Sequence, residues 1–314
     1  MRKINKIINI AVIFMLMGVF LVQDFAYALR PPLQTNKLSR EVKGFLTIDQ
    51  KPASDNVAYS VYEIAMWKEA YAQERAKPII LPGETPSTFI KRLVDTRIIL
   101  PGNNILTLGT WMGHDELYLA GNGCYVLATD FIDNSLEDLK KAAAKRKLQA
   151  YIETTIYNIR KPLNFSPHSF DGIFGGCLSP LQYLEDDEIA KWAKEMRNIV
   201  RPGGIIAFSV RSINDRIFQG EYVKKDGVFV VGVGYKGGPS KKRQRGFTKE
   251  LLRAFFEKGF ESVSIIEREV KRREGVLDTM LELVAVKSQE KAGYLRKLGR
   301  TPELERFRYR NSDI

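Results

Sequence analysis

The stretch Ile-Leu-Thr-Leu-Gly-Thr-Trp-Met-Gly at residues 105–113 decides how this chain folds. Its first four residues are a short apolar run that is typical of a buried strand. Its two glycines bracket a turn that opens a segment with helical spacing at 114–121, and a second apolar run follows at 125–129. A strand, a glycine turn, a helix and another strand in this order predict a parallel βαβ unit.

An acidic residue, Asp130, ends the second of these strands, 17 residues after Gly113. A turn that lets the backbone approach a ligand, a helix N-terminus and an acid at the neighbouring strand tip together describe a nucleoside site, in which the acid accepts hydrogen bonds from ribose hydroxyls. The structural alternative is an exposed acid that caps the next helix. A nicotinamide site is less favoured, because the turn lacks the full G-x-G-x-x-G spacing.

Outward from this unit, apolar runs continue to alternate with helical segments, which predicts an α/β fold with a mostly parallel sheet. The expected strands are 105–108, 125–129, 150–156, 170–175 and 205–210, and the expected helices are 114–121, 134–148 and 186–199. The sequence Pro-Gly-Gly at 202–204 predicts a turn into the fifth strand.

The alternation breaks at 212–246, which we interpret as an insertion. It contains an expected hairpin at 222–232 and a mobile basic loop that includes Lys241–Arg245. A helix at 248–258 and two strands at 262–270 and 278–287 complete the domain. The proposed organisation is a linker at 29–56, a domain at 57–287 whose first part, 57–103, forms N-terminal cap helices, and a basic tail at 288–314.

The first 28 residues predict a secretory signal peptide. A basic start, an apolar run from Ile7 to Val22 and the small-x-small pattern Ala26-Tyr27-Ala28 are its three parts. An uncleaved signal anchor is the alternative, although the run is short for a membrane span. Both place the domain outside the cytoplasm, either exported (periplasmic or secreted) or anchored, with membrane contact only through this segment.

Composition excludes several classes of protein. The 314 residues are 44% hydrophobic and 27% charged, which is an ordinary globular composition, and two cysteines rule out a disulfide scaffold. The net charge of +12 allows an anionic partner through Lys241–Arg245 and the tail, but no nucleic-acid module is recognisable. His114 and His168 lack metal-ligand spacing, so no metal site is expected, and Cys124 and Cys177 are expected to be buried free thiols.

The ordered motifs resemble those of the class I S-adenosylmethionine-dependent methyltransferases of small molecules, from about Tyr59 to Lys287. The matching stretches are 105–113, 119–130, Ser169-Phe170-Asp171 and 200–204. The resemblance implies a Rossmann-like, seven-stranded, mostly parallel sheet with an antiparallel last strand and helices on both faces. It also implies S-adenosylmethionine as the cofactor, lying across the ends of strands one, two and four.

The resemblance also assigns roles to individual residues. Gly109 and Gly113 would line the methionine end of the cofactor, Asp130 would hold the ribose hydroxyls, and Phe131 or Ile132 would pack on the adenine. The remaining cofactor-binding positions that it implies are Trp111, Asn158 and Ile159, where Asn158 replaces an aspartate and can still accept from the adenine amino group. The expected substrate-side positions are Ser179, Tyr183, Arg211 and Tyr222.

Two residues depart from the family pattern. Thr107 replaces the usual acid of the first strand, and Trp111 replaces a glycine whose missing side chain admits the cofactor. The Trp111 indole must point away, fill the space or stack beside the sulfonium, since aromatic faces attract cations. From the ordered motifs, the leading hypothesis is methyl transfer to a small acceptor. Export conflicts with this hypothesis, because the methyl donor is made in the cytoplasm. The alternative is a non-catalytic, exported binding module on the same scaffold.

Overall fold

The computed structural model describes residues 57–75, 86–177, 179–218, 224–226, 229–233, 239–271 and 277–288. The expected signal segment, linker and basic tail lie outside these ranges, as does Tyr222. No helix within them has the length and apolar character needed to cross a membrane.

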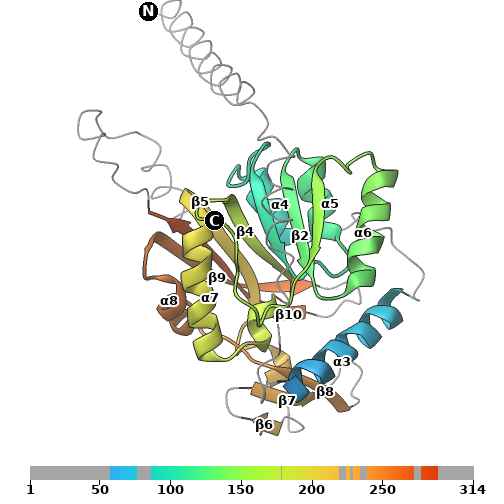
Figure 1. Cartoon of the computed structure of the whole chain (residues 1–314). Helices are drawn as coiled ribbons and strands as arrows, with labels where there is room; N and C mark the ends of the chain where they lie inside the picture. The colour runs from blue at the N-terminus through green and yellow to red at the C-terminus, as the bar shows by residue number, and fades with distance from the viewer. Residues whose placement is uncertain are drawn as a thin grey trace, which may run out of the picture. The chain divides into compact units, whose positions relative to one another are not determined.

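A seven-stranded sheet forms the centre of the domain, in the order β3-β2-β1-β4-β5-β10-β9 (Figure 1). Neighbours from β3 to β5 pair in parallel, whereas β10 runs antiparallel to both β5 and β9. The predicted fold is thus confirmed. The strands are β1 (Asn104–Leu108), β2 (Tyr125–Asp130), β3 (Ile152–Ile156), β4 (Phe170–Cys177), β5 (Val200–Arg211), β9 (Phe260–Lys271) and β10 (Leu277–Lys287).

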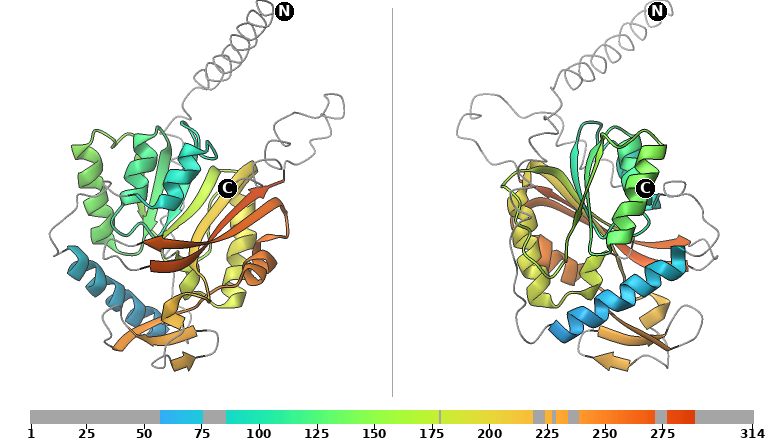
Figure 2. Two further views of the ribbon diagram at one scale, coloured as in Figure 1. Left: turned by 180° about the vertical axis from the view of Figure 1, so that it is seen from behind. Right: turned by 45° about the vertical axis from the view of Figure 1, so that its right-hand side comes forward.

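Helices cover both faces of this sheet (Figures 1 and 2). One face carries α4 (Thr88–Asp95), α5 (His114–Gly121) and α6 (Asp133–Lys145), and the other carries α7 (Asp186–Ile199) and α8 (Lys249–Phe256). Side-chain caps start two of them, because Ser87 accepts from the Ile90 N–H and Thr248 accepts from the Leu251 N–H. Two short 3₁₀ helices, η1 (Pro180–Tyr183) and η2 (Arg216–Phe218), follow β4 and β5.

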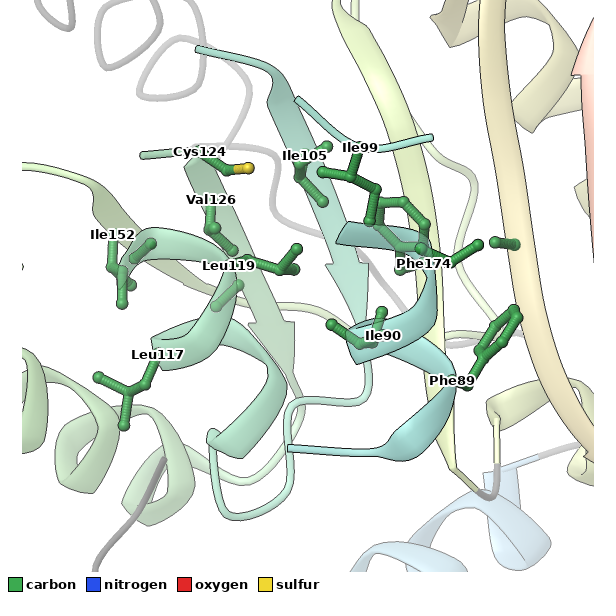
Figure 3. Close-up of a cluster of buried hydrophobic side chains, with 14 of the residues drawn as sticks. Phe89, Ile90, Ile99, Ile105, Leu117, Leu119, Cys124, Val126, Ile152 and Phe174 are labelled. Carbon is green, nitrogen blue, oxygen red and sulfur yellow. The ribbon is translucent and has the colours of Figure 1, made fainter. Parts of the chain in front are cut away.

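The hydrophobic core under α4 and α5 fixes the position of the glycine turn. Ile105 of β1 and Val126 of β2 lie close to Leu119 of α5 (Figure 3). Leu117 of the same helix and Ile90 of α4 belong to the same cluster. All five side chains are at most 3% exposed, so burial of apolar surface holds β1 and β2 against these helices. Cys124 lies in this core as a buried free thiol, as expected, whereas the Cys177 side chain lies outside the described residues.

Two boundary predictions were wrong. β5 begins at Val200 and includes the Pro-Gly-Gly segment, because Val200 pairs with Phe170 and an irregularity in β4 after Phe170 absorbs the bend. Gly203 adopts a φ of 72°, which a glycine tolerates without a steric cost.

The second error concerns the insertion. Residues expected to form a loop are a strand, β8 (Pro239–Gln244), which extends the hairpin of β6 (Lys224–Asp226) and β7 (Phe229–Val233) into a three-stranded sheet. Arg245 is 1% exposed rather than solvated, because it pairs with Asp186 at the start of α7.

Candidate functional site

The glycine turn lies at the point where the strand order reverses, between β2 on one side of β1 and β4 on the other. In doubly wound sheets ligands bind at such a point. The N–H groups of Gly109 and Thr110 donate to the Thr129 carbonyl at 2.9 and 3.1 Å, which ties the turn to β2. Gly109 is exposed and has a φ of 80°. A Cβ at Gly109 would lie 3.0 Å from Pro180 Cγ, so the turn also abuts the start of η1.

Asp130 binds the same turn from the end of β2. Its Oδ2 accepts from the Trp111 N–H at 2.9 Å and its Oδ1 accepts from the Ile132 N–H at 3.0 Å. Burial raises the pKa of this carboxyl, although backbone N–H groups, including those of Phe131 and Thr110, counteract the shift. A carboxylate has about four lone-pair sites, and the two hydrogen bonds of good geometry use one on each oxygen.

Trp111 has a left-handed backbone conformation, with a φ of 52°. This backbone points the indole toward α3 (Val57–Arg75), where it makes edge contacts with Trp67 and Tyr71 at centroid distances of 5.8 and 5.4 Å. Trp67 also contacts Tyr183 of η1, at 5.2 Å. These four rings form an aromatic cluster that joins α3 to the turn after β1 and to the helix after β4.

Polar contacts hold α3 in this position. The Tyr71 hydroxyl donates to Asp138 Oδ2 of α6 at 2.9 Å, and Arg75 pairs with the same carboxylate at 2.8 Å. Burial, together with the Asp138 hydrogen bond, raises the pKa of Tyr71 far above its ordinary value, so it stays a hydrogen-bond donor at physiological pH. Lys68 and Asp133 add a weaker, exposed pair at 3.6 Å.

The other expected cofactor positions differ in their surroundings. Gly113 packs against α6, since a Cβ there would lie 2.8 Å from Leu139 Cδ1. Ile132 is 2% exposed, whereas Phe131 is only partly buried, so Phe131 is the one accessible to a ligand. The loop after β3 is tied to this place because the Tyr157 N–H donates to the Asp130 carbonyl at 2.9 Å.

Asn158 and Ile159 follow in that loop, and both are partly exposed. The Asn158 side-chain carbonyl accepts from the Arg160 N–H at 3.0 Å, which fixes its direction within the loop. The structure therefore brings the seven expected cofactor positions into one region around the ends of β1, β2 and β3.

The sequence analysis did not identify two acidic residues of α5 that lie near the glycine turn. Asp115 accepts from the N–H and the hydroxyl of Ser87 at 2.6 and 3.0 Å. Glu116 is 4% exposed, and burial raises its pKa to about 8, with the neighbouring Asp115 charge as a second cause. Acids in the first turn of a helix ordinarily stabilise its dipole at the surface, so the sequence pattern alone did not single out these two.

On the substrate side, one expectation is wrong. Arg211 is fully buried and forms ion pairs with Asp215 at 2.9 Å and Asp278 at 3.0 Å, so it stabilises the junction of β5 and β10 rather than facing a ligand. Ser179 is 1% exposed and caps η1 by accepting from the Leu181 N–H. Tyr183 joins the aromatic cluster described above.

No group of three or more His, Cys, Asp and Glu side chains in the described ranges could hold a metal ion. His168 lies at the other end of β5, where its Nδ1 is 3.4 Å from the Val200 carbonyl and 3.3 Å from Lys287 Nζ. His114 begins α5 next to the glycine turn.

Comparison with known proteins agrees with this geometry. The family model described as a methyltransferase domain matches residues 105–204, which span the sheet from β1 into β5. No curated protein matches the chain. The match to the family model supports methyl transfer as the general reaction.

Solved structures resemble the domain at low sequence identity. A S-adenosylmethionine-dependent methyltransferase from Methanosarcina mazei superposes with a TM-score of 0.55 at 19% identity, covering 63% of this chain and 98% of its own. The 1,6-didemethyltoxoflavin-N1-methyltransferase of Burkholderia thailandensis, solved with its substrate and S-adenosylhomocysteine, superposes with a TM-score of 0.52 at 17% identity, covering 76% and 93%. Residues 105–204 thus match the methyltransferase-domain family model, within a domain that has the fold of the class I S-adenosylmethionine-dependent methyltransferases.

Proposed function

We propose that this domain transfers a methyl group from S-adenosylmethionine to a small acceptor. The observation that carries the proposal is the pairing of an open glycine turn at Gly109 with a strand-end carboxylate at Asp130, across the switch point of the sheet. Such a pair recognises a nucleoside through backbone approach and ribose hydrogen bonds.

The residues present fit this cofactor. Asp130 has lone pairs available for ribose hydroxyls, Phe131 offers an accessible ring for the adenine, and the exposed Gly109 backbone lies beside the expected methionine portion. The cofactor supplies a methyl group already activated on a cationic sulfonium, so alignment of the acceptor accounts for much of the rate.

We place the acceptor beside η1. Pro180 lies next to the glycine turn, and Tyr183 shares the aromatic cluster with Trp67 and Trp111. Aromatic faces at this end would favour a cationic sulfonium and a flat or apolar acceptor over a large polar one.

Calorimetric titration of the full chain with S-adenosylmethionine and S-adenosylhomocysteine tests the proposal. We expect micromolar binding that Asp130→Ala abolishes, while Glu137→Ala, which removes an exposed acid of α6 that pairs with Lys140 of the same helix, leaves it unchanged. Binding that survives Asp130→Ala would place the cofactor elsewhere. A positive result justifies a screen of small acceptors with a radiolabelled methyl donor.

A non-catalytic binding module is the second candidate, and the aromatic cluster favours it. Trp67 bridges Trp111 and Tyr183, and so α3 covers the turn where the cofactor would enter. This alternative predicts no cofactor binding by the folded parent chain and recovery of binding in Trp111→Gly. Our proposal predicts binding by the parent, with α3 covering the bound cofactor.

We further propose that residues 1–28 direct the domain out of the cytoplasm. The basic start, apolar run and small-x-small pattern support this. Mass spectrometry of the protein recovered from a bacterial host distinguishes the alternatives: an N-terminus at Leu29 indicates cleavage, and an intact N-terminus in the membrane fraction indicates an anchor. An intact chain in the cytoplasmic fraction would contradict both.

Contact with an anionic surface remains a proposal for the basic residues of β8 and the tail. Arg245 is excluded from it by burial, which leaves Lys241, Lys242 and Arg243. Binding to anionic vesicles that weakens steeply with added salt would support it, because contacts with anionic headgroups are salt-sensitive.

A further inference from the structure

Glu116 is an unusual group in the candidate site. It projects from the first turn of α5 and is 4% exposed, and its Oε2 has no hydrogen-bond partner among the described residues. In the same part of the chain, Thr107 Oγ1 of β1 is also buried without a partner. The hydroxyl is near enough to stabilise the Glu116 carboxylate, yet the two groups do not form a hydrogen bond of good geometry. A buried carboxyl oxygen without a donor is costly to maintain.

The position of Glu116 follows from the sheet. β2, β1 and β4 are consecutive in the sheet, so a cofactor that lies across their ends, as the resemblance implies, and whose ribose is held by Asp130 would have its other end near β1 and β4. The first turn of α5 lies at that end: Thr107 of β1 is beside Glu116, and a Cβ at Gly176 of β4 would lie 2.9 Å from Asp115 Oδ2.

We propose that Glu116 receives the ammonium of the cofactor's aminoacyl portion, and that this binding releases a proton from Glu116 to solvent. The inference rests on the proposed function. Thr107 occupies the position at which the family pattern has an acid in the first strand. The inference gives the role of that acid to Glu116 of α5.

The electrostatic surroundings support proton release. Burial and, after it, the charges on Asp115 of α5 and Asp130 of β2 together raise the pKa of Glu116 to about 8. His114 lies two positions earlier on the same helix. An arriving ammonium reverses this balance, because an opposite charge favours the carboxylate. The proton leaves as the ion pair forms, so charge balances.

Two ligands separate this role from a merely structural one. S-adenosylhomocysteine carries the ammonium, whereas 5′-methylthioadenosine has the same nucleoside and sulfur but lacks the aminoacyl portion. We expect calorimetry at pH 7.5, in buffers of different ionisation enthalpy, to show release of less than one proton per site with the first ligand and none with the second.

The variant Glu116→Gln should weaken S-adenosylhomocysteine roughly tenfold, as expected for one charge-assisted hydrogen bond, and leave 5′-methylthioadenosine within about twofold. It should also abolish proton release, while His114→Asn retains it. Thr107→Val, which removes the hydroxyl beside Glu116, should move the pH at which S-adenosylhomocysteine affinity rises to a higher value.

Equal weakening of both ligands in Glu116→Gln, or undiminished proton release in that variant, would overturn the inference alone and leave the proposed function intact. Failure of the folded wild-type chain to bind either ligand would overturn the proposed function, and this inference with it.

Discussion

Trp111 adopts a left-handed backbone that costs a non-glycine residue about 1–2 kcal/mol. Three features offset this cost: the Trp111 N–H donates to Asp130, its carbonyl accepts from the Ser135 hydroxyl, and its ring packs on Trp67 and Tyr71. Each aromatic pair contributes about 0.5–1.5 kcal/mol beyond its buried area. The sequence identified Trp111 as a departure, but the direction of its indole depended on a helix more than 35 residues earlier in the chain.

Glu116 makes the stability of the protein depend on pH. Its pKa is raised from 4.5 to about 8 in the folded state, so the unfolded chain loses this proton at lower pH than the folded one does. The contribution of Glu116 to the free energy of unfolding is therefore fully present below about pH 4.5 and is lost as the pH rises toward 8.

We expect Glu116→Gln to match wild type at pH 5 and to exceed it at pH 8, by on the order of 1–4 kcal/mol, because the amide never ionises. Urea unfolding at the two pH values measures the difference. A constant gap between the two proteins would contradict a buried, titrating Glu116.

Gly113 must remain a glycine for structural reasons. Its φ is 73°, and a Cβ would lie 2.8 Å from Leu139 Cδ1. We expect Gly113→Ala to lower the free energy of unfolding by about 2–4 kcal/mol, from backbone strain and overpacking. Gly121→Ala, at the C-terminal end of α5, is the control, since nothing lies within 4 Å of its Cβ position, and it should be neutral or slightly stabilising.

At the scale of elements, α3 is the part whose attachment matters most for access to the site. It is fixed to α6 through Asp138, which accepts from Tyr71 and Arg75 at 2.9 and 2.8 Å, and to the glycine turn through the aromatic cluster. Because the hydrogen bonds and the ring contacts are separate, either set can be weakened alone.

The variant Asp138→Ala should loosen α3 without unfolding the sheet. Loss of an acceptor for two donors costs about 1–3 kcal/mol, so amide exchange within Val57–Arg75 should accelerate about tenfold or more. Glu137→Ala, an exposed neighbour on α6 that pairs with Lys140, should leave that exchange unchanged. Equal acceleration in both variants would show that the Asp138 contacts do not hold α3.

The elements themselves were largely predictable from sequence, for identifiable reasons. Helix α7 was expected at 186–199 and lies there, because its apolar spacing and acidic first turn are both local signals. The start of β5 was placed too late, since Pro-Gly-Gly is a turn signal that pairing with β4 overrides. β8 was missed because its basic residues carry no strand pattern and it forms by pairing with β7.

The candidate site was only partly predictable. Gly109 and Asp130 could be chosen because their spacing along the chain reflects adjacent strand ends. Asp115, Glu116 and the ring contact of Trp67 could not, because each depends on which side of a helix faces the sheet or the turn. Arg211 was misjudged for the same reason, as its buried acidic partners Asp215 and Asp278 come from different segments.

At the scale of the whole molecule, the fold brings α3 next to the candidate cofactor site. The glycine turn, the end of β2, η1 and α3 all meet at the switch point of the sheet. A cofactor bound there would contact parts of the chain that are far apart in sequence. Its binding should therefore be visible as simultaneous protection of those separate segments.

Amide hydrogen exchange of the full chain, with and without saturating S-adenosylhomocysteine, tests this central claim most directly. We predict slower exchange at 108–113, at 130–132 and in Val57–Arg75, with the β6–β8 sheet unchanged. Unaltered exchange at 108–113 and 130–132 in the folded protein, or protection confined to other segments, would contradict a cofactor site at this edge of the sheet.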